Sequence, residues 1–203
     1  MPAIEKELHR LEEEDEIRLL KAFQKTSQPE LFTLMFITGI SFQELSGCRV
    51  CDYQQEQKKL QITQALNRCG IEKRDGNPRI IPLSEPADRI LQRAIRKGKG
   101  NPADEGRLIF TTAEGEWLQD ACRKDIELIR RETGLQELRK IDIRNSFGIR
   151  AVRLGVNYKA LNRYMGFCSG DTLTRFVNAS RDRETNRPRS EESFWAEESW
   201  AEE

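Results

Sequence analysis

The chain has little histidine and tyrosine, with one histidine, His9, and three tyrosines among its 203 residues. It also lacks an apolar run near the about 20 residues that a membrane helix needs, and its N-terminus lacks the apolar stretch of a signal peptide. Its five cysteines form an odd set without the spacing of a disulfide framework. We therefore expect a cytoplasmic chain without a membrane segment, long enough for one mid-sized domain with tails.

Two of the cysteines, Cys48 and Cys51, have the C-x-x-C spacing of zinc sites. No second pair and no nearby histidine accompanies them, so four ligands cannot be assembled locally. We expect the pair to lie on a buried helix face, and we expect neither a metal ion nor a cofactor.

Charge is strongly segregated although the totals balance at 34 basic and 34 acidic residues. Residues 1–20 carry three Lys/Arg against seven Asp/Glu, and residues 190–203 carry six Glu and no base. Residues 21–189 are left with 31 Lys/Arg against 21 Asp/Glu. A basic body between acidic ends favours a polyanionic partner. The alternative is that the charges only solvate helix surfaces.

Apolar periodicity predicts a chain of helices interrupted by two strands. The strands are expected at 59–63 and 79–83, with a turn at 74–78, and together they would form a small antiparallel hairpin. The helices are expected around 11–23, with an acidic start at 11–16, and around 31–40, 42–45, 86–97, 117–132, 142–152 and 172–177, with another short one ending at Met165. This order predicts an α+β fold that is mostly α.

Several short blocks of the sequence occur in an order that resembles one family. They are His9–Ile17, Thr38–Leu45 (compare T-G-x-R-x-x-E-L), Cys48–Asp52 (L-R-W-x-D), Ile71–Leu83 (a hairpin ending R-x-V-P-L), Leu108–Phe110, Ile141–Phe147 (H-x-L-R-H), Leu154-Gly155, Tyr164–Phe167 and Thr174–Phe176. Together they resemble the catalytic domain of the tyrosine recombinases, or phage integrases. The resemblance implies that family's helical catalytic fold over 10–180, preceded by an N-terminal extension at 1–9 and followed by an acidic, Trp-containing tail at 181–203.

The resemblance implies a known chemistry, in which a tyrosine attacks the scissile phosphate while two arginines hold its oxygens and a hairpin lysine acts as general acid. Arg144 and Lys73 match the retained positions, with Arg74 as an alternative to Lys73. The positions that depart from the family pattern are Ser41 for the first arginine, Ile141 and Asn145 for the two histidines, Phe167 for the histidine or tryptophan, and Phe176 for the nucleophile.

A phenylalanine at the nucleophile position has no oxygen to attack phosphorus. No internal histidine is present to move in, and Tyr164 lies twelve residues before Phe176, on the wrong side of the motif. We therefore expect a protein that is not an enzyme. A recombinase with an unconventional nucleophile is the remaining catalytic alternative.

The basic residues around these positions are expected to keep a surface for duplex DNA, since the family cups DNA with phosphate contacts. The predicted DNA-binding residues are Lys73, Arg74, Arg79, Arg139, Lys140, Arg144, Arg150, Arg153 and Arg175. The alternative is that these side chains are solvated helix faces paired with glutamates. We expect a regulatory or accessory role, in transcription or alongside recombination and integration.

The acidic C-terminal segment offers a second kind of function. Its apolar anchors are Phe194, Trp195 and Trp200, and tryptophan is enriched at interaction hot spots. The segment could fold back over the basic surface, bind another protein such as an active recombinase, or only keep the chain soluble. The main alternative to DNA binding is therefore a protein-interaction module.

Overall fold

The structure is a computed structural model that describes residues 11, 13–67, 70–73, 78–99, 101, 104–118 and 122–166. All structural statements below concern these residues. The helices are α1 (Glu13–Phe23), α2 (Pro29–Thr38), α3 (Phe42–Gly47), α4 (Glu85–Lys97), α5 (Arg123–Thr133), α6 (Lys140–Arg153) and α7 (Tyr158–Met165), with short 3-10 turns η1 (Val50–Asp52) and η2 (Gln55–Gln57).

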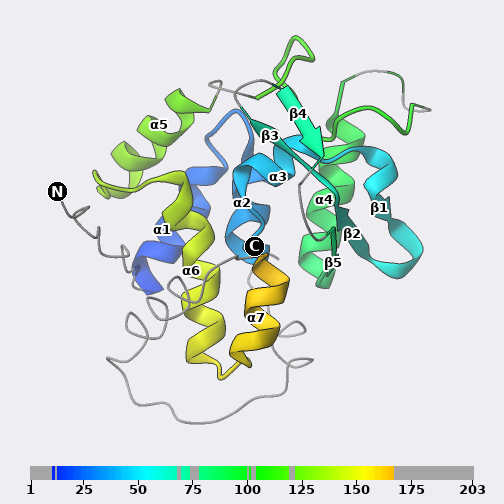
Figure 1. Ribbon diagram of the computed structural model, residues 1–203. Coiled ribbons are helices and arrows are strands. Elements are labelled where there is room, and N and C mark those ends of the chain that lie inside the picture. The colour runs from blue at the N-terminus through cyan, green and yellow to red at the C-terminus, as the bar shows by residue number, and fades with distance from the viewer. Residues whose placement is uncertain are drawn as a thin grey trace, which may run out of the picture.

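Helix α2 forms the centre of the core because its sequence is apolar on every side. Every residue from Leu31 to Thr38 is buried, and the hydroxyls of Thr33 and Thr38 donate to carbonyl oxygens one turn earlier in the helix. Helices α4 and α6 both pack against α2, while α1 packs against α5 (Figure 1). The central position of α2 places its C-terminal end, and the turn into α3, beside α6.

Gly39 ends α2 in the left-handed conformation, with φ of 64°. Its N–H donates to Met35 O, which satisfies a carbonyl of the last turn. A Cβ at this position would lie 2.5 Å from Phe147 Cδ1. Only glycine therefore lets α2 turn into α3 this close to α6.

The strands form two small antiparallel sheets. The first has the order β1 (Tyr53–Gln54), β2 (Lys59–Ile62), β5 (Arg79–Pro82), and the second pairs β3 (Gln64–Asn67) with β4 (Gly70–Lys73). Strand β3 packs closely on α3, since a Cβ on Gly47 would meet the backbone of Ala65 at 3.1 Å.

The predicted α+β fold, mostly helical with small antiparallel sheets, is confirmed. The strands at 59–63 and 79–83 also pair as expected. They are separated by a second hairpin, however: Ile71 to Lys73 pair with β3 rather than with the strand at 79–83.

Two smaller predictions are wrong. Trp117 and Leu118 precede α5 instead of belonging to it, and α5 begins at Arg123. Cys48 is buried, but Cys51 is exposed in η1, so the two thiols share no buried helix face.

Burial raises the pKa of the Cys122 thiol to about 12, which keeps that thiol protonated.

None of the helices described is long and apolar enough to cross a membrane. The same residues contain no cluster of three or more His, Cys, Asp or Glu side chains that could hold a metal ion.

Candidate nucleic-acid interface

Ser41, at the position of the first family arginine, caps helix α3. Its Oγ accepts from Glu44 N at 3.3 Å, and its own N–H donates to Glu44 Oε2 at 3.0 Å, which makes a reciprocal capping box. The hydroxyl also donates to Glu44 Oε2 at 2.8 Å. The serine is thus used to start a helix and to hold a carboxylate.

Glu44 forms a buried ion pair with Arg79 from β5. The two guanidinium terminal nitrogens donate to Glu44 Oε1 at 2.6 Å and Oε2 at 3.0 Å, and Arg79 Nε donates to Tyr164 O at 2.6 Å. The two side chains are only 8% and 4% exposed. Burial lowers the pKa of Arg79 to about 10, so the guanidinium stays charged at neutral pH.

Arg144, the retained family arginine, lies one helix turn into α6 and is also directed inward. Its Nε donates to Gly39 O at 2.8 Å, and its Nη2 donates to Met165 O. Arg144 and Arg79 therefore hold consecutive carbonyls at the end of α7. We name Ser41, Glu44, Arg79 and Arg144 the arginine frame.

Two further family positions lie on α6 beside Arg144. The side chain of Ile141 is 42% exposed and that of Asn145 is buried. Neither can act as a proton donor in place of histidine. The Oδ1 of Asn145 accepts no hydrogen bond from any residue that the structure describes, which is uncommon for a buried polar atom.

The first turn of α6 carries two of the predicted DNA-binding residues. Arg139 donates to the buried Asp142 carboxylate through Nε at 2.8 Å and Nη2 at 2.7 Å, and this contact raises the pKa of Arg139. Lys140 Nζ lies 3.8 Å from the centre of the ring of Phe42, the residue that follows Ser41 in the chain. Lys140 therefore borders the arginine frame.

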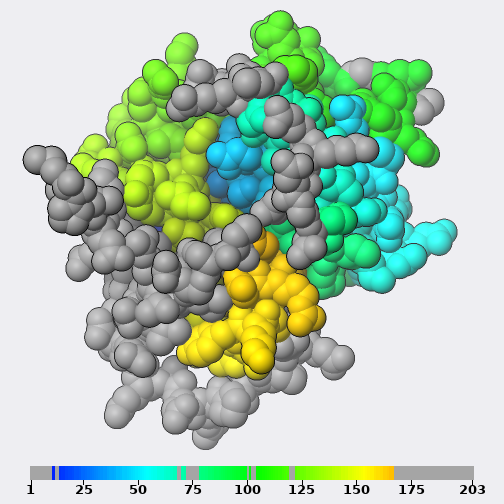
Figure 2. All heavy atoms as spheres, in the orientation of Figure 1, coloured from blue at the N-terminus to red at the C-terminus, as the bar shows by residue number. Residues whose placement is uncertain are grey.

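A basic hollow of about 340 Å³ lies between α5 and the start of α6. Its lining residues are Arg123, Ile126, Glu127, Arg130, Arg139 and Lys140, and we name it the α5–α6 hollow. Figure 2 shows atoms of the α2–α3 region between those of α6 and those of the strands, on the face shown. Arg139 is paired with Asp142, and the other lining cations, Arg123, Arg130 and Lys140, outnumber Glu127, which favours an anion in the hollow.

Arg150 and Arg79 do not present their guanidinium groups to solvent as a DNA-contact prediction requires. Arg150 donates to Glu16 Oε1 at 3.2 Å and Phe36 O at 2.6 Å, and its side chain is 14% exposed. Burial against internal partners argues against direct phosphate contacts by these two arginines. Arg153 lies in the last turn of α6, at the far end of the helix from Lys140.

Several predicted residues have no described side chain. Lys73 is described only as the last residue of β4. Outside the described residues lie Arg74, Phe167, Arg175, Phe176, Phe194, Trp195 and Trp200.

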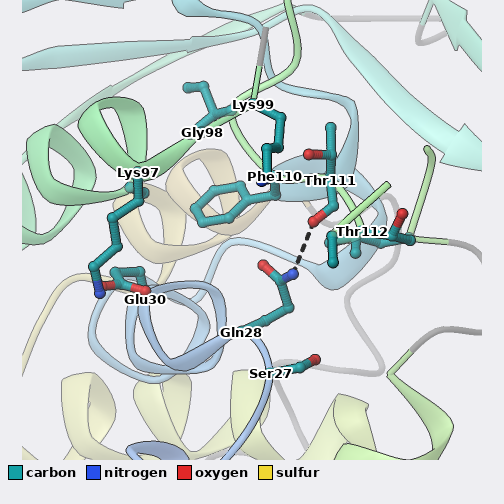
Figure 3. A pocket seen from close by; sticks show the side chains of 13 residues that line it. Ser27, Gln28, Glu30, Lys97, Gly98, Lys99, Phe110, Thr111 and Thr112 are labelled. Atoms are coloured by element: carbon teal, nitrogen blue, oxygen red, sulfur yellow. Dashed lines mark hydrogen bonds and ion pairs between the residues drawn. The ribbon is translucent and has the colours of Figure 1, made fainter. Parts of the chain in front are cut away.

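A second hollow, of about 270 Å³, lies between the start of α2 and the end of α4. Gln28 Nε2 donates to Thr111 O at 2.8 Å across it, and Lys97 Nζ lies 2.5 Å from Glu30 Oε1 (Figure 3). These four groups thus pair with one another, and the hollow shares no lining residue with the arginine frame or with the α5–α6 hollow.

Sequence reasoning missed Glu44 as the centre of the frame, and Arg123 and Arg130 as lining of the hollow. Arg123 and Arg130 are seven residues apart, a spacing that puts both on one helix face. This spacing can be recognised in the sequence. No local signal identifies Arg79 as the partner of Glu44, because the two lie on different elements.

Comparisons with known proteins agree with this architecture. The family model described as the phage integrase family matches residues 9–183. The search of curated proteins found no match.

Among solved structures, the Tn1549 transposon integrase in complex with transposon right end DNA is similar over 91% of this chain, with TM-score 0.72 and 19% identity. This chain spans 65% of that structure's length. XerA recombinase has a TM-score of 0.69 at 15% identity, covering 87% of this chain and 61% of its own. The catalytic domain of bacteriophage HP1 integrase has a TM-score of 0.60 at 20% identity, covering 86% and 90%.

Proposed function

Since this chain belongs to the phage integrase family, we propose that it binds duplex DNA without cleaving it, in a regulatory or accessory role. The proposed contact surface lies beside the arginine frame, over the start of α6, where Lys140 and Arg139 lie. Binding is electrostatic and directed at the phosphate backbone, so it weakens steeply with salt. We propose the cytoplasm as its location.

The observation that carries the proposal is the use of Ser41. The family reaction needs two guanidinium groups on one phosphate, and here position 41 supplies a hydroxyl that caps α3 and binds Glu44. A hydroxyl cannot replace a bidentate cation as charge develops on phosphorus. Together with Ile141 and Asn145 in place of histidines, this supports binding without chemistry.

The solved relatives support the DNA part of the proposal. The Tn1549 integrase chain with transposon right end DNA carries a Tyr-to-Phe substitution, so a protein of this fold held DNA with one tyrosine hydroxyl removed. XerH recombinase was also solved bound to its difH substrate, with TM-score 0.65 and 18% identity.

A duplex titration at several salt concentrations tests the proposal. The wild-type chain is expected to bind a short fluorescent duplex with a clearly negative slope of log affinity against log salt. Arg144→Ala is a poor probe, because Arg144 also holds Gly39 and Met165 carbonyls. Arg144→Lys keeps a cation at this position and is therefore the better variant for measuring DNA affinity. Absence of binding at low salt would reject the proposed function.

A further inference from the structure

We infer that Trp117 is a positioning residue for the β3–β4 hairpin: its ring supports Gly70 at the start of β4 and thereby sets the place of Lys73 at the end of that strand. The inference rests on the proposed function, because Lys73 is one of the residues predicted to bind duplex DNA. It assigns a role to Trp117, which matches none of the recombinase-like positions and lines neither hollow.

The ring of Trp117 lies directly against the backbone of β4. A Cβ added at Gly70 would lie 3.1 Å from Trp117 Cη2 and 3.2 Å from Trp117 Cζ3. Gly70 is buried, with φ of 133°, whereas Trp117 is 48% exposed. A glycine has no side chain of its own to pack, so an aromatic ring from a neighbouring segment can cover the strand there and fix its position.

The rest of the hairpin is held through β3 rather than through β4. Strand β3 packs on α3 at Gly47 and Ala65, and Leu66 of β3 is buried. Within the part of the chain that the structure describes, β4 pairs with β3 alone. A two-stranded hairpin is only marginally stable by itself. The contact of Trp117 is therefore a second attachment, and it lies on the four-residue strand that ends at Lys73.

Trp117 can support the hairpin because its own backbone is held on both sides. On the N-terminal side, Thr112 closes a turn: its N–H donates to Glu116 O at 2.9 Å, and its Oγ1 accepts from Glu116 N at 3.2 Å. On the C-terminal side, Leu118 is buried in the core. The ring thus projects from a fixed segment onto β4.

Hydrogen exchange of the full-length chain tests the support without DNA. Trp117→Ala is expected to speed amide exchange at 70–73 about tenfold. Tyr158→Ala, a change of another half-exposed aromatic residue, is expected to match wild type. Gly70→Ala should act like Trp117→Ala, because its methyl group would displace the ring. The matched control is Gly115→Ala, whose φ is 90° and whose added Cβ would meet nothing within 4 Å. Unchanged exchange at 70–73 in Trp117→Ala would overturn the inference.

Duplex titrations test whether the support acts through Lys73. Trp117→Ala is expected to weaken duplex binding about threefold in the wild-type background and to have no effect in a Lys73→Gln background. Trp117→Phe keeps a ring near Gly70 and is expected to restore most of the affinity. A general loss of packing, or a direct contact of the indole with DNA, would weaken binding equally in both backgrounds. Equal weakening therefore contradicts the positioning role.

The two proposals fail in different ways. If wild type binds duplex and Trp117→Ala changes neither exchange nor affinity, the inference falls and the proposed function stands. If wild type binds no duplex at low salt, the proposed function falls together with the role of Lys73. The exchange measurement then still decides whether Trp117 holds the hairpin.

Discussion

The arginine frame and the α5–α6 hollow use the same kind of side chain in opposite ways. In the frame, Arg79 and Arg144 give their N–H groups to a buried carboxylate and to backbone carbonyls. In the hollow, no residue within the described ranges accepts from the terminal nitrogens of Arg130, and Lys140 lies over the Phe42 ring. The cations of the arginine frame thus stabilise the fold, while cations beside the frame are placed to bind an anion.

The largest effect is expected from Arg79→Met. Removing the guanidinium leaves the Glu44 carboxylate buried without its partner, which costs about 3–5 kcal/mol. Thermal or denaturant unfolding measures the loss. The double variant Glu44→Gln/Arg79→Met removes both charges and should recover most of it. Equal losses in the single and double variants would show that the pair is not a coupled unit.

Gly39→Ala is expected to cost about 2–4 kcal/mol, from left-handed strain together with overpacking against Phe147. The matched control is Gly134→Ala, whose φ is 78° but whose added Cβ would meet nothing within 4 Å. That control isolates the strain of the left-handed conformation, at about 1 kcal/mol. If the two variants unfold alike in denaturant, the close approach between the α2–α3 turn and α6 is not a constraint.

Arg150→Gln and Lys140→Gln separate stability from binding on a single helix. Arg150→Gln should lower the free energy of unfolding by about 1–3 kcal/mol, because Glu16 and Phe36 O lose their charged donor. Its salt slope for duplex binding should stay at the wild-type value. Denaturant unfolding and duplex titration measure the two quantities.

Lys140→Gln should show the reverse pattern. Its stability should change by less than about 1 kcal/mol, the range of an exposed cation–π contact. Its salt slope should fall by about 0.9. If instead Arg150→Gln changes the slope and Lys140→Gln does not, the contrast between internal and available cations is wrong.

Ser41→Ala should change stability alone, by about 1 kcal/mol from loss of the N-cap. Duplex affinity should not change, because Ser41 is used within the frame. Unfolding and titration of the same preparation check both parts. A large loss of affinity would mean that the hydroxyl contacts DNA directly.

The sequence predicted the helices well where burial follows from local pattern. The apolar stretch of α2 and the periodic faces of α4 and α6 are strong local signals. The β3–β4 hairpin was missed, because strand pairing is decided by partners outside the strand. The departure of position 41 from the family pattern could also be predicted, since it concerns residue type alone.

The direction of the arginines could not be predicted. Arg79 and Arg150 appear in the sequence as members of a basic region. The partners of Arg79 are Glu44 and Tyr164 O, and the partners of Arg150 are Glu16 and Phe36 O. Each partner belongs to an element far from its arginine in the sequence. Only the packed fold decides whether a guanidinium meets solvent or an internal acceptor.

The most direct test of the central proposal follows the wild-type chain on a nicked duplex that traps covalent recombinase intermediates. Anisotropy should report salt-dependent binding, and addition of a denaturing detergent should release all of the DNA. A detergent-resistant protein–DNA adduct would contradict the account. It would show that another residue of this chain attacks the phosphodiester although position 176 is Phe.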